Sequence, residues 1–572
     1  MAKINWNEIT ADDVVEAVRI FDSEHPEHPE PRSSFLVYGG RKYPAKHIRG
    51  MAYQVHFGQE ISKADYSGGE ETIRFFHRLG FETQYTHQNV NTHPVRTTKA
   101  APDKKNVKTE AEAKPEKAAA DTESAAPQKI QTIPTRKSGR EPLKIGLYLQ
   151  TNDVCNKKSF KQAMSIVKQS DIDILVLPEI AWVPFVKEIQ SGDFLNRKYV
   201  DILYEEALAL SEEIGRAIVF CNEDQYGTIM SIYANACAAE GETVCKDYIK
   251  HTATRYSAFE IENYPQYAEA AFQPILYKGN HIGLTICYDC NHALFSRKYG
   301  QSGVDIILNS TGGNVVYDKW FKYNKARAIE NHCFTFTTMG GPDGENPQNY
   351  VFGFTPEGKE MQPSLLNGAY DGRRSISGGI YVYSTDEYDG STEVDPSIRQ
   401  AETVNKKADL FVPVSDIEGF ISHAEKLTDN LRVLKHGDSS VVLCLVDGND
   451  IMKPEKVLKL LYADELKPVK NKKYIIVNRW DNIDRGFYES KLSLILKVRS
   501  MENYCAVLLA SPALTKCYQC GQNRTAQVVA SQNGTFGIDL ARTGGPETIW
   551  KNKAGMKAAW RSNAEWLIGS LS

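Results

Sequence analysis

The fold of this chain is decided by the stretch Thr285-Ile286-Cys287-Tyr288-Asp289, in which a thiol follows an apolar run. Two earlier stretches have the same form: Leu175-Val176-Leu177-Pro178-Glu179 ends in a carboxylate, and Tyr248-Ile249-Lys250 ends in an ammonium. Covalent hydrolysis of an amide requires these three groups as nucleophile, proton carrier and oxyanion donor. Each stretch alone is weak evidence, because free cysteines commonly fill protein cores. Together, in this order, they predict a hydrolytic site.

Three longer stretches extend the pattern. They are Leu143-Lys144-Ile145-Gly146-Leu147-Tyr148-Leu149-Gln150, Lys325-Ala326-Arg327-Ala328-Ile329-Glu330-Asn331 and Phe352-Gly353-Phe354-Thr355-Pro356-Glu357-Gly358. With the reactive side chains they resemble the nitrilase (carbon–nitrogen hydrolase) superfamily over about residues 142–395. They look like the first strand, a helix after the nucleophile and a late hairpin of that family. The resemblance implies an α/β fold in which two sheets stack as an α-β-β-α sandwich.

The resemblance also assigns a role to each reactive group. Cys287 would attack the carbonyl carbon, and Glu179 would carry protons between the thiol, the leaving amine and water. Lys250 would lower the pKa of the thiol by its charge and later stabilise the oxyanion. The backbone N–H of Tyr288 would be the second oxyanion donor.

The surroundings of this triad are less well defined. Many family members carry a second glutamate after the lysine; we choose Glu260, with Glu262 as the other candidate and an ordinary surface acid as the competing interpretation. The family often continues after the nucleophile with Tyr-Asp-x-Arg-Phe-Pro, whereas Tyr288-Asp289-Cys290-Asn291-His292 lacks the arginine. An unusual substrate pocket is therefore expected. Arg327 and Glu330 are expected to brace the fold.

The composition limits the class of protein. The chain has 572 residues, too many for one core, and its net charge of −4 does not indicate nucleic-acid binding by the whole chain. No run of apolar residues is long enough to predict a membrane span, and the start of the chain is too polar for a signal peptide. Its 11 cysteines, several within apolar runs, favour a reducing cytoplasm.

We expect no cofactor and no metal ion. Cys517-Tyr518-Gln519-Cys520 is a CxxC pattern that no further Cys or His follows. Zinc usually requires four such ligands. A redox pair or a chance spacing is the favoured interpretation.

The sequence divides into four parts. We expect a small α+β module over residues 1–86, a flexible linker over 87–141, the hydrolase domain over 142–395 and a further α/β domain over 400–572. The linker is rich in Ala, Lys, Glu, Pro, Thr and Ser and cannot bury enough apolar surface to offset ordering. A solvated charged helix is the alternative there.

The N-terminal module begins with the capping-box-like Thr10-Ala11-Asp12-Asp13. Through Tyr43-Pro44-Ala45-Lys46, Ser67-Gly68-Gly69-Glu70-Glu71-Thr72 and Leu79-Gly80-Phe81 it resembles a small module of bacterial restriction and defence proteins. Binding of nucleic acid is one interpretation and a simple surface turn the other. For the binding interpretation, the candidate phosphate contacts are Lys46, His47, Arg49 and Arg74.

The C-terminal part has buried strands at about residues 441–446, 474–477 and 505–509, with helical patterns between them. Its role is not evident from its pattern. Glutamine-dependent NAD synthetases join a nitrilase domain to an ATP-using α/β domain. Their Ser-Gly-Gly-x-Asp-Ser loop has no counterpart after Ser377-Gly378-Gly379 or Ser67-Gly68-Gly69, which disfavours that interpretation.

These observations predict a cytoplasmic, metal-independent hydrolase of an amide or carbamoyl carbon–nitrogen bond, acting on a small molecule. A homo-oligomer assembled through residues 142–395 and a role as effector of bacterial antiphage defence are further expectations. Two other functions remain open: a nitrilase-like assembly or sensing module without turnover, and an amidotransferase half that supplies ammonia to the C-terminal domain.

Overall fold

The computed structural model describes most of the chain outside the predicted linker. The described residues are 6, 8–24, 34–38, 41–59, 61, 72, 75–76, 79, 81–85, 140–150, 157–179, 181, 197–224, 227–234, 237–239, 241–242, 245–252, 271–312, 316–340, 350–367, 378–521, 524–550 and 554–571. The predicted linker up to residue 139 lies outside them, as do Arg74, Glu260 and Glu262. The chain divides into two compact units, residues 1–127 and 128–572.

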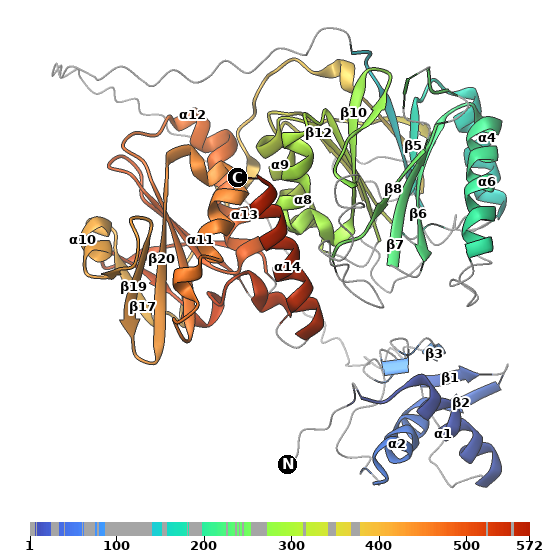
Figure 1. The fold of residues 1–572 in the computed structure, drawn as a ribbon, viewed down its shortest axis with the longest axis horizontal. Coiled ribbons are helices and arrows are strands. Elements are labelled where there is room, and N and C mark those ends of the chain that lie inside the picture. Colours follow the sequence, from blue (N-terminus) through green and yellow to red (C-terminus); the bar gives the residue numbers. More distant parts are fainter. Residues whose placement is uncertain are drawn as a thin grey trace, which may run out of the picture. The chain divides into compact units, whose positions relative to one another are not determined.

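The N-terminal unit packs two helices on a small antiparallel sheet (Figure 1). Its elements are α1 (Ala11–Glu24), β1 (Ser34–Tyr38), β2 (Arg41–Pro44), α2 (Ala45–Phe57) and β3 (Glu82–Tyr85), with the strand order β2-β1-β3. The predicted capping box is confirmed: the Asp13 carboxylate accepts from the Thr10 N–H at 2.7 Å, and the Thr10 hydroxyl accepts from the Asp13 N–H at 3.3 Å. Val14, Leu36 and Ile48 lie in one buried core.

The second unit begins with two stacked sheets. Their elements, with flanking helices, are β4 (Lys144–Leu149), α4 (Lys157–Gln169), β5 (Ile174–Val176), α6 (Arg197–Ile214), β6 (Ala217–Asp224), β7 (Gly227–Tyr233), β8 (Cys245–Ile249), β9 (Ile275–Tyr277), β10 (Asn280–Ile286), the 3-10 helix η3 (Cys287–Asn291), α8 (Ala293–Gln301), β11 (Ile306–Thr311), α9 (Tyr317–Asn331), β12 (Phe334–Met339), β13 (Tyr350–Phe354), β14 (Ser364–Asn367) and β15 (Gly379–Ser384). The outer sheet has the order β14-β15-β4-β5-β6-β7-β8, and the inner sheet has the order β13-β12-β11-β10-β9.

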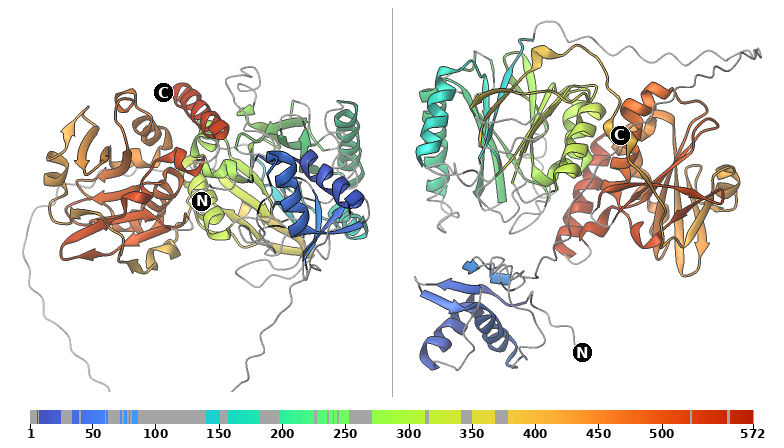
Figure 2. Two further views of the ribbon diagram at one scale, coloured as in Figure 1. Left: turned by 90° about the horizontal axis from the view of Figure 1, so that it is seen from below. Right: turned by 180° about the vertical axis from the view of Figure 1, so that it is seen from behind.

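Helices cover the two sheets on their far faces. Figures 1 and 2 show α4 and α6 on the outer sheet and α8 and α9 on the inner sheet. Strand β5 illustrates how the layers form: Ile174 and Val176 lie in the core between the sheets, while Leu175 lies in the core beneath α4 and α6. The predicted α-β-β-α sandwich is therefore confirmed.

The C-terminal part continues in the same unit. Its elements are β16 (Glu402–Thr403), β17 (Leu410–Pro413), α10 (Ile417–Ser422), β18 (Glu425–Lys426), β19 (Leu431–His436), β20 (Ser439–Asp447), the 3-10 helix η6 (Gly448–Met452), α11 (Pro454–Leu461), β21 (Lys472–Arg479), α12 (Arg485–Phe487), α13 (Ser493–Asn503), β22 (Ala506–Ala510), β23 (Lys516–Cys520), β24 (Ala526–Val529), β25 (Ser531–Gln532), β26 (Thr535–Ile538) and α14 (Ala554–Leu571). The three buried strands expected from the sequence are β20, β21 and β22.

A long sheet dominates the C-terminal part, with the order β16-β24-β23-β22-β21-β20-β19-β18. One face of β20, with Val441 and Leu443, packs on the small sheet β17-β26-β25. The other face, with Val442 and Cys444, belongs to the same core as α11, α13 and α14. These helices pack against α8 and α9, so the C-terminal part covers the helical face of the inner sheet (Figures 1 and 2).

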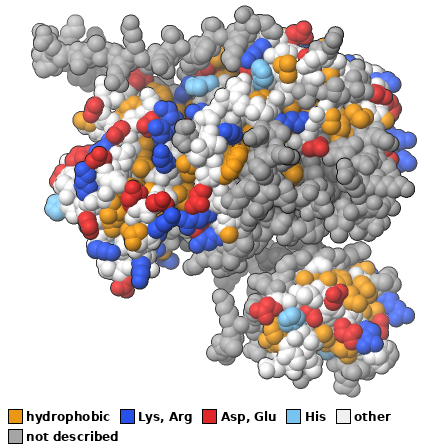
Figure 3. Space-filling view, viewed as in Figure 1, with side chains coloured by type: hydrophobic (Ala, Val, Ile, Leu, Met, Phe, Trp, Pro, Cys, Tyr) orange, Lys and Arg blue, Asp and Glu red, His pale blue; other side chains and the backbone are white. Residues whose placement is uncertain are grey.

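None of the helices in the described part of the chain combines the length and the apolar composition needed to span a bilayer. On the face drawn in Figure 3, acidic and basic side chains are interspersed over the C-terminal part.

Candidate active site

The three predicted reactive side chains follow the ends of strands that meet at one place. Glu179 comes three residues after β5, Lys250 directly after β8 and Cys287 directly after β10. Strands β5 and β8 run in the same direction in the outer sheet, so their carboxyl ends lie at one edge. Lys250 Nζ lies 2.6 Å from Glu179 Oε1, and both side chains are at least 90 % buried. The structure thus pairs the carboxylate with the ammonium.

Cys287 occupies a strained turn. Its φ is 43°, in the left-handed region that side chains other than glycine rarely adopt, and it begins η3 immediately after β10. Only 7 % of the residue is exposed. Strained positions of this kind concentrate at active sites, where the surrounding structure holds them in place. We call residues 287–292 the nucleophile turn.

The two charged groups act on the thiol in opposite senses. Burial raises the pKa of Cys287 well above its usual value; the Glu179 carboxylate raises it further and the Lys250 ammonium lowers it. Burial also opposes the charge of Lys250, but Glu179 and Cys287 hold the pKa of the ammonium above its usual value. Burial and Glu179 thus favour the neutral form of the Cys287 thiol, and the Lys250 ammonium favours the thiolate.

Asp289 ties the nucleophile turn to the end of β8. Its carboxylate accepts hydrogen bonds from the Tyr248 hydroxyl at 2.9 Å and from the Thr252 N–H at 2.9 Å, on either side of Lys250. Burial raises the pKa of Asp289 to about 6, against the effect of Lys250 and these donors. Sequence reasoning did not single out this residue. The available signal was the position of this carboxylate, two residues after Cys287 and close to the end of an apolar run.

Glu179 is held from a second side. Its Oε2 accepts from the Gly312 N–H at 3.0 Å, and the Ser310 hydroxyl donates to the Leu177 carbonyl at 2.7 Å. Ser310 lies in β11 and Gly312 directly follows it, so the inner sheet holds a carboxylate that the outer sheet carries. Hydrogen bonds between the two sheets thus fix the position of the Glu179 carboxylate.

Other predicted residues have mixed outcomes. Tyr288 follows Cys287 in η3, with its ring 5.6 Å from that of Trp320. Arg327 and Glu330 are buried, and Arg327 Nε donates to the Cys290 carbonyl at 3.0 Å, which is the bracing expected of this helix.

The candidate phosphate contacts of the N-terminal unit need one correction. Arg49 is 2 % exposed, with its guanidinium 4.0 Å from the Trp6 ring centre and Nη1 donating to the Thr72 hydroxyl at 3.1 Å. It is a core residue, because a cation stacked on aromatic rings inside the unit is not available to a phosphate. Lys46 and His47 are half-buried.

The CxxC pattern also has a structural explanation. Cys517 and Cys520 are buried free thiols in β23, where residues three apart point to opposite faces of the sheet. The redox-pair interpretation is therefore wrong, and the spacing is a coincidence of two core positions.

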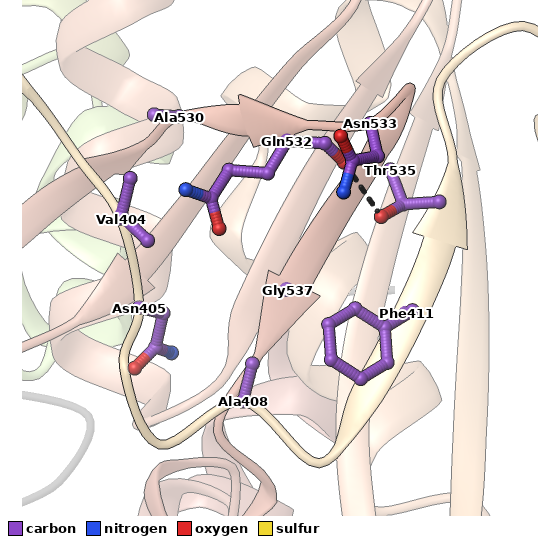
Figure 4. A pocket seen from close by; sticks show the side chains of 9 residues that line it. All are labelled: Val404, Asn405, Ala408, Phe411, Ala530, Gln532, Asn533, Thr535 and Gly537. Carbon is purple, nitrogen blue, oxygen red and sulfur yellow. Dashed lines mark hydrogen bonds between the residues drawn. The ribbon is translucent and has the colours of Figure 1, made fainter.

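A small pocket lies in the C-terminal part of the chain (Figure 4). Its volume is about 180 Å³, and it is lined by Val404, Asn405, Ala408, Phe411, Ala530, Gln532, Asn533, Thr535 and Gly537. These nine residues bring no ionisable side chain, so this pocket offers no acid–base chemistry.

Comparison with known proteins agrees with this geometry. Residues 155–355 match the carbon–nitrogen hydrolase family, and residues 7–85 match the ScoMcrA-like N-terminal head domain. None of the curated proteins matches the chain.

Two solved structures are similar to part of this chain. One is an amidase from Nesterenkonia sp. AN1 with the acetamide moiety of fluoroacetamide added at its active-site cysteine; it is 15 % identical, covers 44 % of this chain and 93 % of that chain, and has a TM-score of 0.33. The other is a carbon–nitrogen hydrolase from Helicobacter pylori, with 14 % identity, coverage of 43 % and 89 %, and a TM-score of 0.31. By the two family matches, residues 155–355 form a domain of the carbon–nitrogen hydrolase family, preceded at residues 7–85 by a ScoMcrA-like N-terminal head domain.

Proposed function

We propose that this chain hydrolyses the carbon–nitrogen bond of a small amide or carbamoyl compound through a thioester on Cys287. The observation that carries the proposal is the buried Lys250–Glu179 pair, 2.6 Å apart, whose two charges both act on the pKa of the Cys287 thiol. The match of residues 155–355 to carbon–nitrogen hydrolases supports the reaction class.

Acylation would proceed in two steps. Glu179 takes the proton of the Cys287 thiol as sulfur attacks the carbonyl carbon, and Lys250 with the Tyr288 N–H stabilises the oxyanion. The protonated Glu179 then gives this proton to the nitrogen of the leaving group. The carbon–nitrogen bond breaks, and ammonia or an amine departs.

Deacylation reuses the same carboxylate. Glu179 removes a proton from water as the water oxygen attacks the thioester, and the proton returns to the departing sulfur of Cys287. The product is a carboxylic or carbamic acid. Every proton and charge in this scheme comes from side chains of the chain, so the reaction as proposed requires no metal ion.

The test uses a panel of primary amides and carbamoyl compounds, with ammonia release and the intact mass of the protein as readouts. Wild type should release ammonia and carry an acyl group on Cys287, and Cys287→Ala should do neither. Cys245→Ala, which removes an exposed thiol of β8, is the matched control and should behave as wild type. Ammonia release by Cys287→Ala at the wild-type rate would refute the proposal.

A second proposal concerns the N-terminal unit. Its match to a ScoMcrA-like head domain supports a recognition role, with nucleic acid as the ligand and antiphage defence as the setting of the hydrolase. The described cysteines are free thiols, which suits the reducing cytoplasm proposed as its location. The full chain should bind labelled DNA at low salt and lose binding as salt rises. Absence of binding at low salt would remove the nucleic-acid role.

The proposed homo-oligomer would assemble through residues 142–395. The α8 and α9 face of that region already contacts the chain's own C-terminal part, so another face would have to mediate assembly. Light scattering of the purified chain distinguishes a monomer from an oligomer.

A further inference from the structure

The C-terminal part repeats the inner sheet. Strands β19 to β23 adopt the order β23-β22-β21-β20-β19, as strands β9 to β13 adopt the order β13-β12-β11-β10-β9. The directions also agree. In each set the two central pairings are parallel, and the two outer ones are antiparallel. Each set also carries a helix between its second and third strands and another between its third and fourth.

The turn after the second strand of each set is repeated in detail. Gly448, directly after β20, has a φ of 46°, and Cys287, directly after β10, has a φ of 43°. A 3-10 helix and then an α-helix follow in both places. The second copy has the same left-handed turn, but Gly448 stands where the first copy has Cys287. Glycine adopts this conformation without strain. The repeat therefore has no thiol at the equivalent position.

The helices that brace these turns are also repeated. Lys497-Val498-Arg499-Ser500-Met501-Glu502-Asn503 in α13 corresponds to Lys325-Ala326-Arg327-Ala328-Ile329-Glu330-Asn331 in α9. Arg499 Nε donates to the Ile451 carbonyl at 3.0 Å, as Arg327 Nε donates to the Cys290 carbonyl at 3.0 Å. Each arginine therefore holds the turn of its own copy.

The two copies meet through these same side chains, which we call the arginine–glutamate quartet: Arg327, Glu330, Arg499 and Glu502. Arg327 donates to Glu330 in its own helix and to Glu502 across the contact. Arg499 donates to Glu502 at 2.5 Å in its own helix and lies 2.7 Å from Glu330 across the contact. The pairing is reciprocal, as across a two-fold axis, and all four side chains are at least 96 % buried.

Two further contacts join the C-terminal part to the nucleophile turn. Arg524 Nη1 lies 3.4 Å from the Tyr288 hydroxyl, and the Trp560 ring lies 4.2 Å from the His292 ring. With the bond from Arg327 to Cys290, which Glu502 orients, the turn is held at alternate residues along its length. Each of these contacts depends on the C-terminal part.

We propose that the C-terminal part is a nucleophile-free copy of the inner half of the hydrolase domain, and that it acts within the chain as a positioning subunit for Cys287. This inference rests on the proposed function, since it assigns Glu502 and Arg524 a role in presenting the nucleophile. Neither residue touches the reacting atoms. Both act through the shape of the turn that carries Cys287 and Tyr288.

The repeat supplies its own control. Arg327→Lys and Arg499→Lys keep the positive charge and each remove one bond to a turn carbonyl, in equally buried places. Arg327→Lys should lower kcat on the order of 10- to 100-fold with KM unchanged, because small misplacements of a reacting group have effects of this size. Arg499→Lys should lose similar thermal stability and keep kcat within about threefold of wild type. Equal losses of kcat in both would overturn the proposal.

The contact between Arg524 and the Tyr288 hydroxyl is tested by Arg524→Gln, which removes the charge. Arg524→Lys, which keeps the charge, is the conservative variant. The readout is alkylation of Cys287 by iodoacetamide across pH, followed by peptide mass spectrometry, with the exposed Cys245 as internal reference. Arg524→Gln should slow alkylation of Cys287 relative to Cys245 by about tenfold, and Arg524→Lys should restore part of it. An unchanged Cys287 rate in Arg524→Gln would remove this residue from the positioning role.

The two proposals fail separately. Alkylation requires no substrate, so it reports on the nucleophile turn even if the hydrolysed compound is unknown. If Cys287→Ala abolishes hydrolysis while both Arg327→Lys and Arg524→Gln behave as wild type, the positioning role is wrong and the hydrolase stands. If Cys287→Ala leaves hydrolysis intact, the proposed mechanism is wrong.

Discussion

Lys250 Nζ and Glu179 Oε1 lie 2.6 Å apart although β6 and β7 separate the strands that carry them. The pair is buried, so each charge depends on the other for its stability in the interior. Cys287 approaches it from the inner sheet, and its thiol pKa responds to both charges. A site of this form belongs to neither sheet alone.

Glu179→Gln should nearly abolish turnover while the protein stays folded. The amide keeps the shape and can still accept from the Gly312 N–H, but it cannot take the thiol proton. Loss of a general base typically costs a factor of about 10² to 10⁴ in rate. Pre-steady-state acylation measured by mass spectrometry checks this, and Glu213→Gln, at an exposed carboxylate of α6, is the control. Acylation of Glu179→Gln at the normal rate would place the base elsewhere.

Lys250→Met should weaken transition-state stabilisation by about 2–4 kcal/mol, the size of a lost oxyanion donor. It should also raise the pKa of Cys287, because the ammonium now lowers that pKa. Alkylation of Cys287 should then begin at higher pH than in wild type. The control is Lys246→Met, which removes a lysine within β8 and should leave the alkylation profile unchanged. A profile that does not move in Lys250→Met contradicts the electrostatic role.

The protein should lose stability in mild acid. Burial lowers the pKa of His251 to about 3 and that of His292 to about 3, so both are neutral in the folded state. A lowered histidine pKa gives stability that is complete above about pH 6.5 and is lost as pH falls toward 3, at about 1.4 kcal/mol per pH unit for each group. Asp289, with its pKa raised to about 6, contributes in the opposite sense and offsets part of this slope.

Urea unfolding between pH 7 and 4 measures this dependence. His251→Gln should reduce the slope of the unfolding free energy against pH. One of the two imidazoles that take up a proton on unfolding is then absent. His423→Gln, at an exposed histidine, should leave the slope as in wild type. A wild-type stability that stays constant from pH 7 to 4 would show that the buried imidazoles are not neutral in the folded state.

Arg49→Ala should loosen the N-terminal unit by about 2–3 kcal/mol, because it removes a buried cation and its contacts with Trp6, Phe75 and Thr72. Hydrogen exchange of the α2 amides measures this opening directly. Lys46→Ala, one turn earlier in the same helix, should change exchange little because its side chain is only half-buried. If the two variants exchange alike, Arg49 is not a core residue.

Several features of this protein were determined by local sequence. Continuous apolar runs such as Ile174–Val176 predict strands buried on both faces, and these runs end in the residues that form the candidate site. The α-β-β-α class was implied by the resemblance to the nitrilase superfamily, whereas the buried strands of the C-terminal part follow from the same patterns. They could be predicted because strand period and apolar content are short-range properties of the chain.

The copy of the inner half in the C-terminal part was missed, although a signal was present. Arg499, Glu502 and Asn503 repeat the spacing of Arg327, Glu330 and Asn331. The repeat has glycine where the first copy has its nucleophile, so a search for reactive side chains passes over it. Comparison of the two helices along the chain would have found it.

Only the tertiary structure decided the contacts that hold the nucleophile turn. Asp289 meets Tyr248 in β8 and Thr252 just after that strand, and Arg327 meets Glu502 from another part of the chain. The burial of Arg49 also depends on aromatic rings distant in sequence. Contacts of this kind depend on how layers stack, which no local pattern encodes. The sequence determined which groups the chain carries to its strand ends, and packing between sheets and between the two copies determined which of them meet.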